Sequence, residues 1–496
     1  MHEDLIKAVK NFIEAKEVEV GEKDGKYFVD FDCRTLYRED IEKIQDYLDK
    51  NSKKHYVILS FSSSFSKRLN KATQRIYFKV FESKEEKEKF LKELEEAKKR
   101  DHRYLGERLD IFHIEEDIIG SGLPLFHFNG AIIRNELIKL IREVNEELGY
   151  KEVFTPHLSK TFLWKLSGHY DKYRDKMFLW KEDEEEFGLK PMNCPMHLMI
   201  FKSRVRSYKD LPFRIAEFAT VYRKEQSGEL HGLARVYALT QDDHHCVLSL
   251  EHLEEEIKKI VKKVVDVYNL FGLEVKINLS TRPDQYIGSL EDWNFAEDTL
   301  KKVLESLGLK FEIKEKEGAF YGPKIDFDAR DSLGRYWQLA TIQLDFNMPK
   351  RIGVTYVDKD NKEKHPIMIH FAILGSLERF IALILEHFAG KLPTWLSPIQ
   401  VSVLPLSEKY EKEAKEFLEE LKRNKIRAEL LTEGTIEYRV RDAELRYIPY
   451  IVVIGRKEIE TGNLTIRHRG NLIVMKKEEF IKIILEEINT RKISQQ

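Results

Sequence analysis

The stretch of residues 213–247 constrains the fold more than any other part of the sequence. Two strand-like runs, 213–225 and 234–247, flank a polar, glycine-containing loop at 226–233, a pattern that predicts a long β-hairpin. Further strand candidates follow one another directly between residues 324 and 357, with helix-like segments around them. Strands in direct succession favour an antiparallel sheet flanked by helices, so we expect an α+β fold rather than a doubly wound one.

The two faces of this hairpin differ sharply in polarity. Alternate residues of a strand share a face, and the even positions are mostly apolar, as at Phe218, Val236 and Ala238. The odd positions carry a polar set: Glu217, Arg223, Glu225, Arg235, Gln241, Asp243 and His245. A merely solvated sheet face usually carries Lys, Thr and Ser, and few groups that are so costly to desolvate. We therefore interpret the odd face as a binding site.

Arginine and glutamate on one face suit a nucleoside triphosphate. Guanidinium groups bind phosphate oxygens in pairs, and a carboxylate can accept the exocyclic amine of adenine. The sequence holds neither a Gly-x-x-x-x-Gly-Lys-Ser/Thr loop nor a Gly-x-Gly-x-x-Gly loop, so ATP would be held in neither a P-loop nor a Rossmann crevice. Arg379, in the apolar helical run 374–385, fits either an exposed arginine or a buried anion clamp, and the pattern alone favours exposure.

Metal ligands cannot be assigned from spacing alone. On a strand His245 points to the polar side, whereas His244 and Cys246 share the opposite face. Cys194, in a proline-flanked turn, and His370, between apolar residues, fit ordinary core positions, and no Cys-x-x-Cys pair occurs. Spacing by itself therefore favours satisfied core residues.

Composition limits the class of protein. The 84 Lys and Arg against 86 Asp and Glu exclude a uniformly basic nucleic-acid coat, although a local basic stripe stays open. The longest apolar runs fall far short of the roughly 20 residues that cross a membrane, and the acidic start is unlike a secretory signal. Three scattered cysteines do not form a disulfide framework. We expect a cytoplasmic protein with no membrane partner.

The 496 residues predict several domains, since about 150 residues per domain is typical. We expect a small α/β N-terminal region over residues 1–80 and a charged helical linker over 81–109. The α+β domain would span residues 110–392 and end at a proline-punctuated connector. A βαβ pattern then predicts an α/β domain over residues 398–496.

Several motifs together resemble those of the class II aminoacyl-tRNA synthetases, and within them the threonyl-tRNA synthetase family. Residues 136–156, 223–235 and 375–379 are similar to the first, second and third signature motifs of the class. The threonyl type is indicated by five runs: 190–195, 227–233, 240–243, 318–324 and 372–379. The resemblance covers about residue 75 to the C-terminus and implies an antiparallel class II core, a homodimer formed at the first motif, and a C-terminal α/β anticodon-binding domain.

The resemblance implies a threonine–tRNA ligase, which forms threonyl-adenylate from ATP and L-threonine and transfers the threonyl group to the 3′ end of tRNA(Thr). It implies one catalytic Zn²⁺ per subunit at Cys194, His245 and His370, and Mg²⁺ with ATP. In the family, threonine binds zinc through its amine and hydroxyl, and valine, nearly the same in shape, has no oxygen to offer the metal.

The resemblance also assigns further residues by position. Arg223 and Arg379 would neutralise the triphosphate, and His169 would lie near the terminal ribose of tRNA during transfer. The residues expected at ATP are Arg223, Glu225, Arg235, Gln338, Thr341 and Arg379. The residues expected at threonine are Gln241, Asp243 and Tyr321. The residues expected at the anticodon are Arg441, Glu458 and Arg467, with possible phosphate contacts from Arg439, Arg456 and Arg469.

The N-terminal region departs most from the family. Bacterial members usually carry an editing domain with His-x-x-x-His and Cys-x-x-x-His pairs, and residues 1–75 contain neither pair. Only residues 72–81 resemble the end of such a domain, so the region is either a remnant or an unrelated module. A zinc site cannot exclude serine, which lacks only a methyl group worth about 1 kcal/mol. We therefore predict that some seryl-tRNA forms and is not cleared in cis.

Two other classes of protein were weighed against a ligase. A catalytically inactive, synthetase-like tRNA-binding or regulatory protein would have lost some of Arg223, Arg379 or the metal trio, and all are present. A zinc hydrolase needs a general base beside metal-bound water, and no His-Glu-x-x-His helix occurs. Seryl and prolyl synthetases are nearer rivals, but neither fits the threonyl-type motifs together. We favour the ligase.

Overall fold

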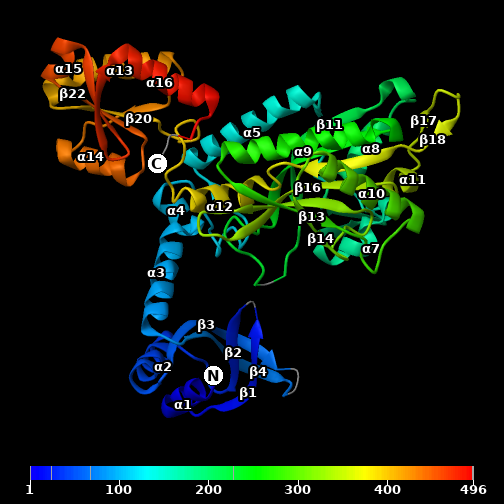
Figure 1. Cartoon of the computed structure of the whole chain (residues 1–496), viewed down its shortest axis with the longest axis horizontal. Helices are drawn as coiled ribbons and strands as arrows, with labels where there is room; N and C mark the ends of the chain where they lie inside the picture. Colours follow the sequence, from blue (N-terminus) through cyan, green and yellow to red (C-terminus); the bar gives the residue numbers. More distant parts are fainter. Residues whose placement is uncertain (1, 24, 67–68, 227, 494–496) are drawn as a thin grey trace. The chain divides into compact units, whose positions relative to one another are not determined.

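The computed structural model describes residues 2–23, 25–66, 69–226 and 228–493, and it divides into two compact units, residues 1–99 and 100–496. Figure 1 shows the elements along the chain. Within the described residues, no helix combines the length and apolar character that a membrane span requires.

The first unit is a small α/β fold. Its elements are α1 (Glu3–Phe12), β1 (Lys16–Lys23), β2 (Lys26–Asp32), α2 (Arg38–Asn51), β3 (His55–Ser66) and β4 (Lys71–Phe81). The strands form an antiparallel sheet in the order β1-β2-β4-β3. Alternate residues such as Val29, Phe31 and Ile76 pack with Leu5 and Ile44 of the helices, so this unit has a core of its own.

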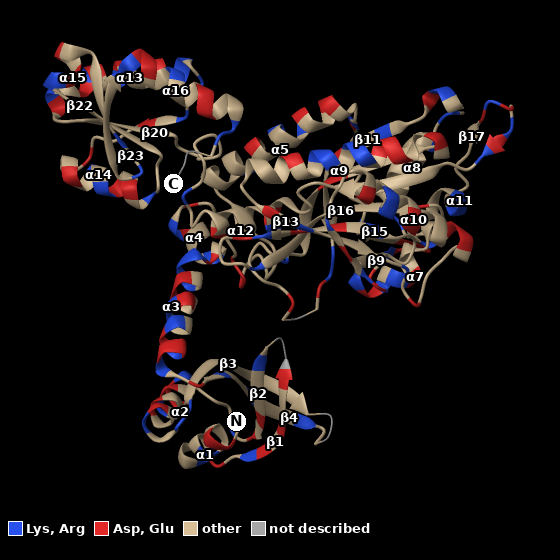
Figure 2. Ribbon diagram, in the orientation of Figure 1, with Lys and Arg blue, Asp and Glu red and all other residues tan. Residues whose placement is uncertain are grey.

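The predicted helical linker consists of two helices rather than one. Helix α3 (Lys84–Arg100) has no buried residue, and Figure 2 shows basic and acidic residues alternating along it. Helix α4 (His102–Arg108) begins anew because the Asp101 carboxylate accepts the N–H of Arg103 and so acts as the N-cap. The Lys- and Glu-rich pattern concealed this break.

The second unit is built on an eight-stranded sheet in the order β14-β13-β15-β16-β19-β12-β11-β7. The strands are β7 (Lys151–Glu152), β11 (Phe213–Tyr222), β12 (Ala238–Leu248), β13 (Glu274–Ser280), β14 (Phe311–Lys314), β15 (Lys324–Arg330), β16 (Tyr336–Asp345) and β19 (Ile367–Ala372). All inner pairs are antiparallel, and only the outermost pairs, β13–β14 and β11–β7, are parallel. The predicted antiparallel α+β fold is confirmed.

Helices α5 (Phe128–Leu148), α9 (Leu253–Leu270), α10 (Leu290–Ser306) and α12 (Leu377–His387) contribute to one large apolar core with this sheet. Figure 1 shows α5 and α9 running beside the sheet. The shorter elements are β5 (Phe112–His113), β6 (Leu125–Phe126), β8 (Leu158–Lys160), α6 (Phe162–Ser167), α7 (His169–Tyr173), β9 (Leu179–Glu182), β10 (Glu185–Leu189), α8 (Cys194–Lys202), α11 (Met348–Ile352), β17 (Tyr356–Val357) and β18 (Glu363–Lys364).

The predicted hairpin is formed by β11 and β12, which pair antiparallel from Phe213 opposite Val247 to Tyr222 opposite Ala238. The strands end earlier at the loop than the sequence predicts. Arg223, Glu225 and Arg235 therefore lie in the connection between the strands rather than on them.

The C-terminal part is an α/β fold, as its pattern predicts. Its elements are β20 (Val401–Pro405), α13 (Glu411–Arg423), β21 (Ala428–Leu430), α14 (Ile436–Leu445), β22 (Tyr450–Ile454), α15 (Arg456–Thr461), β23 (Asn463–His468), β24 (Asn471–Lys476) and α16 (Lys477–Thr490). The sheet order is β21-β20-β22-β23-β24, parallel at the first three strands and antiparallel at the last three. Val401, Val452 and Ile466 belong to its separate core.

Candidate active site

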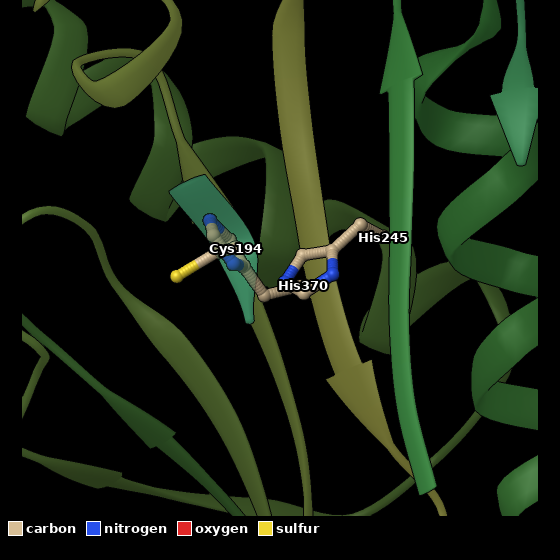
Figure 3. A group of neighbouring side chains, drawn as sticks. All are labelled: Cys194, His245 and His370. Carbon is tan, nitrogen blue, oxygen red and sulfur yellow. The ribbon is translucent and has the colours of Figure 1, made fainter. Parts of the chain in front are cut away.

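Cys194, His245 and His370 meet although they are far apart in the sequence. Cys194 is the first residue of α8, whereas His245 on β12 and His370 on β19 are cross-strand partners (Figure 3). One potential ligand atom from each residue lies within 4.8 Å of the others, and all three residues are buried. A thiolate and two imidazoles are preferred zinc donors, and three protein ligands leave a position open for a substrate. The donor set therefore fits a catalytic zinc.

The neighbours of His245 on β12 point into the core, as strand alternation predicts. The ring of His244 stacks on Phe371 with 4.4 Å between centroids, and its Nε2 lies 2.7 Å from the Asn145 side-chain oxygen. Cys246 is fully buried in the main core. The two adjacent histidines are thus separated by the sheet, and only His245 belongs to the trio.

A cavity of about 500 Å³ adjoins the trio. All six residues expected at the metal and at threonine line it: Cys194, Gln241, Asp243, His245, Tyr321 and His370. Lys324 and Gln343 also line it, although the sequence singled out neither. Gln343 pairs with His370 across β16 and β19 and accepts a hydrogen bond from Tyr321, a relation that only the strand register reveals.

Asp243 places a partly buried carboxylate in the wall of this cavity. Asn193 donates to it at 2.8 Å, and burial raises the pKa of Asp243 above its ordinary value. A partly buried carboxylate that faces an open cavity favours a cationic partner there, because the positive charge of the partner offsets the cost of burying the negative charge of the carboxylate. The ammonium group of an amino acid is a partner of this kind.

Two arginines expected at ATP have donors without partners. The Nε–H groups of Arg223 and Arg379 are buried and donate to no acceptor among the described residues. Burial and the nearby charge of Arg235 lower the pKa of Arg379. Buried, unpaired guanidinium donors with a second cation beside them fit an anion. The expectation that Arg379 is exposed is therefore wrong, because α12 packs within the core.

Gln338 and Thr341 both reach Asp326, at 2.9 and 3.3 Å. Residues three apart on a regular strand face opposite sides, but β16 has a bulge at Leu339, where the pairing with β15 shifts. Gly375, with φ of +77°, lies so close that a Cβ would be 2.8 Å from the Leu339 carbonyl oxygen. This bulge, which no periodic pattern in the sequence indicates, brings the two side chains to the same face.

The connection between β11 and β12 is anchored by a residue that the sequence analysis missed. His102 accepts the N–H of Leu233 through Nε2 at 3.0 Å, and its Nδ1 lies 2.7 Å from Glu386. Asp101, His102 and Glu386 also lie together like metal ligands, but both ring nitrogens of His102 are already engaged. The Lys224 N–H also donates to the Lys176 carbonyl oxygen at 2.8 Å, and the Glu225 carboxylate lies 3.4 Å from the Lys176 ammonium group. Ser227 lies outside the described residues.

His169 lies behind Cys194 and does not line the cavity. Its Nδ1 is 2.9 Å from the Ser167 hydroxyl and its Nε2 is 3.7 Å from the Cys194 sulfur. Burial lowers the pKa of His169 to about 4. The structure thus brings His169 to the metal trio but not to the surface of the cavity.

Arg441, Glu458 and Arg467 line one hollow of about 740 Å³ in the C-terminal domain. Glu458 is largely engaged there, since its carboxylate accepts from the Gly455 N–H and the Thr465 hydroxyl. Arg439 is buried and donates to the carbonyl oxygens of Pro405 and Leu431, so the suggested phosphate contact of Arg439 is wrong.

Comparison with known proteins identifies both folds. The family described as "tRNA synthetase class II core domain (G, H, P, S and T)" matches residues 173–388, and the family described as "Anticodon binding domain" matches residues 400–487. A solved structure, titled as the RNA binding domain of threonyl-tRNA synthetase from Cryptosporidium parvum Iowa II, is similar with a TM-score of 0.75 and 37% identity. That match covers 80% of this chain and 99% of the other.

Relatives match along most of their length. The threonine–tRNA ligase catalytic subunit of Sulfurisphaera tokodaii is 52% identical over 421 residues, which cover 84% of this chain and 78% of the relative. The subunit of the same name from Sulfolobus acidocaldarius is 49% identical over 453 residues, covering 89% of this chain and 81% of the relative. The chain belongs to the threonine–tRNA ligase family of class II aminoacyl-tRNA synthetases.

Proposed function

We propose that the chain selects L-threonine through a zinc ion at Cys194, His245 and His370, activates it with ATP and transfers it to tRNA(Thr). The convergence of the three ligand atoms on a cavity that also contains Gln241 and Asp243 carries this proposal. Zinc, when bound, supplies an open coordination position that favours a substrate with both an amine and a hydroxyl. Valine lacks the hydroxyl.

The residues of the cavity then divide between the two substrates. Asp243, with Gln241 and Tyr321, would hold the amine and hydroxyl of threonine, because these side chains line the cavity beside the trio. Arg223 and Arg379 would bind the triphosphate through the guanidinium donors that the chain leaves unpaired.

The remaining residues of the nucleotide end complete the ATP site. Glu225 would accept the adenine amine, and Arg235, beside Arg379, would add positive charge at the phosphates. Gln338 and Thr341, held by Asp326, would face the ribose. Magnesium would accompany ATP, as polyphosphates usually require.

The proposed reaction has two steps. The threonine carboxylate attacks the α-phosphorus, a carboxyl-oxygen–phosphorus bond forms, and pyrophosphate leaves. A hydroxyl of the terminal ribose of tRNA then attacks the acyl carbon of the adenylate, so an ester bond forms while the bond from the acyl carbon to the phosphate oxygen breaks. AMP leaves, and the hydroxyl proton passes to its departing phosphate. Because His169 is buried behind Cys194, we assign it a positioning role at the transfer step. Arg441, Glu458 and Arg467 would contact the anticodon.

The region of the first motif fits a homodimer. Strand β7 is the edge of the main sheet, and the nearby Phe154 is 80% exposed, as is Phe128 to 88%. Large apolar side chains beside a sheet edge fit burial against a second copy of the chain. We further propose a cytoplasmic enzyme that forms some seryl-tRNA and does not clear it in cis, because serine offers the same amine and hydroxyl.

Amino-acid-dependent ATP–pyrophosphate exchange tests the proposal, with threonine, serine and valine, before and after removal of zinc. We expect exchange to be strongest with threonine, weaker with serine and negligible with valine, and to be lost with the metal. Absence of exchange from zinc-replete protein would instead favour the inactive tRNA-binding or regulatory protein. Hydrolysis of seryl-tRNA by the isolated chain would contradict the lack of editing.

A further inference from the structure

Behind His245 lies a group of buried polar side chains that the proposed reaction does not use. The group consists of His197 on α8, Glu217 on β11, Lys190, and Thr155 beyond β7, and none of these residues is more than 3% exposed. Buried charged and polar groups are costly unless they are paired, so such a cluster needs a reason.

The contacts form a continuous series that ends at the metal trio. Nδ1 of His245 lies 2.7 Å from Nδ1 of His197, and Nε2 of His197 lies 2.9 Å from a Glu217 carboxylate oxygen. The same carboxylate accepts the N–H and the hydroxyl of Thr155 at 2.7 and 2.9 Å. Lys190 stands 3.5 Å from Glu217 and donates to the Thr155 hydroxyl at 2.8 Å.

The hydrogen bonds along this series link the tautomer of His245 to Glu217. The hydrogen bonds from His197 and Thr155 lower the pKa of Glu217 in spite of its burial, which alone would raise it. The Glu217 carboxylate can only accept, so Nε2 of His197 carries a proton. In a neutral His197 the other nitrogen, Nδ1, is an acceptor. His245 must then donate from its own Nδ1, and its Nε2 keeps a free lone pair.

The alternative arrangement would block the metal. A doubly protonated His197 would donate to Nδ1 of His245 and leave the proton of His245 on Nε2, the nitrogen that a metal needs. The arrangement in which Glu217 accepts from His197 and His197 accepts from His245 is the one that leaves Nε2 of His245 open to a metal.

We propose that Glu217 and His197 are positioning residues that hold His245 as the Nδ1–H tautomer and so prepare its Nε2 as a zinc ligand. This inference rests on the proposed zinc site. His370 is held by a single partner instead of a series. Its Nε2 lies 3.2 Å from the Asp345 carboxylate, which leaves Nδ1 for the metal. Partners behind a metal-bound histidine commonly fix its tautomer and its orientation in this way.

The test is the rate at which a colorimetric chelator removes zinc from the holoenzyme, together with the zinc content per chain. We expect His197→Phe, which keeps a planar ring but cannot hydrogen bond, to weaken zinc retention by about 10–100-fold. His197→Gln should retain most of the affinity, because its amide can accept from His245 and donate to Glu217.

A second variant tests the same hydrogen bonds without replacing the ring of His197. Glu217→Gln preserves shape, but its amide N–H can donate to Nε2 of His197 and reverse the direction of both hydrogen bonds. We expect the same loss of zinc retention. The matched control is His244→Gln, which alters a buried histidine next to His245 whose partner, Asn145, lies in the core. Its zinc release should match that of the wild type.

The outcomes separate this inference from the proposal on which it rests. The metal site itself would be overturned if the wild-type chain held no zinc. It would also be overturned if the Cys194→Ala variant kept its zinc. Zinc retained by the wild type and lost in Cys194→Ala, but released at the wild-type rate from His197→Phe and Glu217→Gln, would overturn only the positioning role. Equal acceleration in His244→Gln would do the same, because the effect would then be general loosening.

Discussion

The two faces of strand β12 carry the same residue types for opposite purposes. On one face Asp243 and His245 line the cavity. On the other face Asp242 accepts the N–H groups of residues 373 and 374 at 2.8 and 2.9 Å, and His244 stacks on Phe371 in the core. An aspartate and a histidine therefore occur twice, one residue apart, once as parts of a site and once as parts of the fold.

The source of the partners distinguishes the two faces. The core face takes its partners from the chain: backbone N–H groups for one oxygen of Asp242 and the Asn145 side chain for Nε2 of His244. The remaining Asp242 oxygen and Nδ1 of His244 have no partner among the described residues, but they are buried away from the cavity. On the cavity face, Nε2 of His245 lies 3.7 Å from Asp243, and both residues line open space that a ligand can enter. A substitution on the core face should therefore reduce stability, whereas one on the cavity face should reduce chemistry.

The largest expected effect comes from the two histidines. His245→Ala should remove zinc and reduce threonine-dependent exchange by more than the roughly 100-fold seen for partners behind a metal ligand. His244→Ala should keep zinc and exchange but lose about 2–4 kcal/mol of stability, because it loses a buried hydrogen bond and leaves a cavity. Zinc analysis, exchange rates and thermal unfolding measure both variants. If His244→Ala lost its zinc while the protein remained fully folded, the assignment of separate roles to the two faces of β12 would be refuted.

The next largest effect concerns the carboxylate of the cavity face. Asp243→Asn keeps the acceptor for Asn193 but removes the charge that would face the threonine amine. We expect the KM for threonine in the exchange reaction to rise about 10–100-fold, since hydrogen bonds to charged groups contribute roughly 1.5–3 kcal/mol. The KM for ATP should change little. An equal rise in both constants would show that Asp243 does not belong to the amino-acid end.

The core-face carboxylate, Asp242, should instead affect how the free energy of unfolding changes with pH. Burial raises the pKa of Asp242 to about 7, above its value in the unfolded chain. The folded state then holds the proton more tightly, so the stability from this group is greatest at low pH, falls as the pH rises from about 4 to about 7, and changes little above that. Asp242→Asn should therefore gain thermal stability over the wild type as the pH rises.

The expected gain is on the order of 1–3 kcal/mol between pH 5 and pH 8, somewhat below the full linkage value because a buried carboxylate finds partial compensation. Its size can be measured from thermal midpoints of both proteins across that range. The amide can still accept the two backbone N–H groups, so the fold should persist. Parallel pH profiles for the two proteins would refute the assignment of the titration to Asp242.

Strand alternation explains why the sheet type and the opposite orientations of neighbouring β12 side chains could be predicted from the sequence. The hairpin pattern over residues 213–247 predicted both the antiparallel sheet and the separation of His244 from His245. Alternation could not bring Cys194 and His370 to His245, because helix α8 and strand β19 approach β12 only through the tertiary fold. Their grouping was expected from the family resemblance alone.

The features that were missed depend on register and on contacts between distant segments. The bulge at Leu339, which brings Gln338 and Thr341 to one face, leaves no periodic signal. The anchoring of Leu233 by His102 joins segments 131 residues apart. His197 did leave a signal, because it follows Cys194 by three residues, and such residues lie on one face of a helix. That spacing could have indicated a third histidine beside the metal site, in addition to His245 and His370.

The smallest expected effect concerns the two buried cysteines. Cys194 belongs to the trio, whereas Cys246 lies on the core face of β12, where burial holds the pKa of its thiol well above the ordinary value. Burial raises the pKa of the Cys194 thiol in the same way, so the face to which the side chain points, rather than its charge state, separates the two cysteines. Cys246→Ala should therefore retain zinc and exchange activity in full.

The only cost of Cys246→Ala should be the loss of one packed sulfur atom. We expect about 1 kcal/mol, comparable to the removal of one buried methyl group, and a thermal midpoint lower by about 2–4 °C. Cys194→Ala, by contrast, should lose zinc and exchange. If Cys246→Ala lost zinc instead, the face to which a β12 side chain points would not decide its role, and the separation argued for His244 and His245 would fail with it.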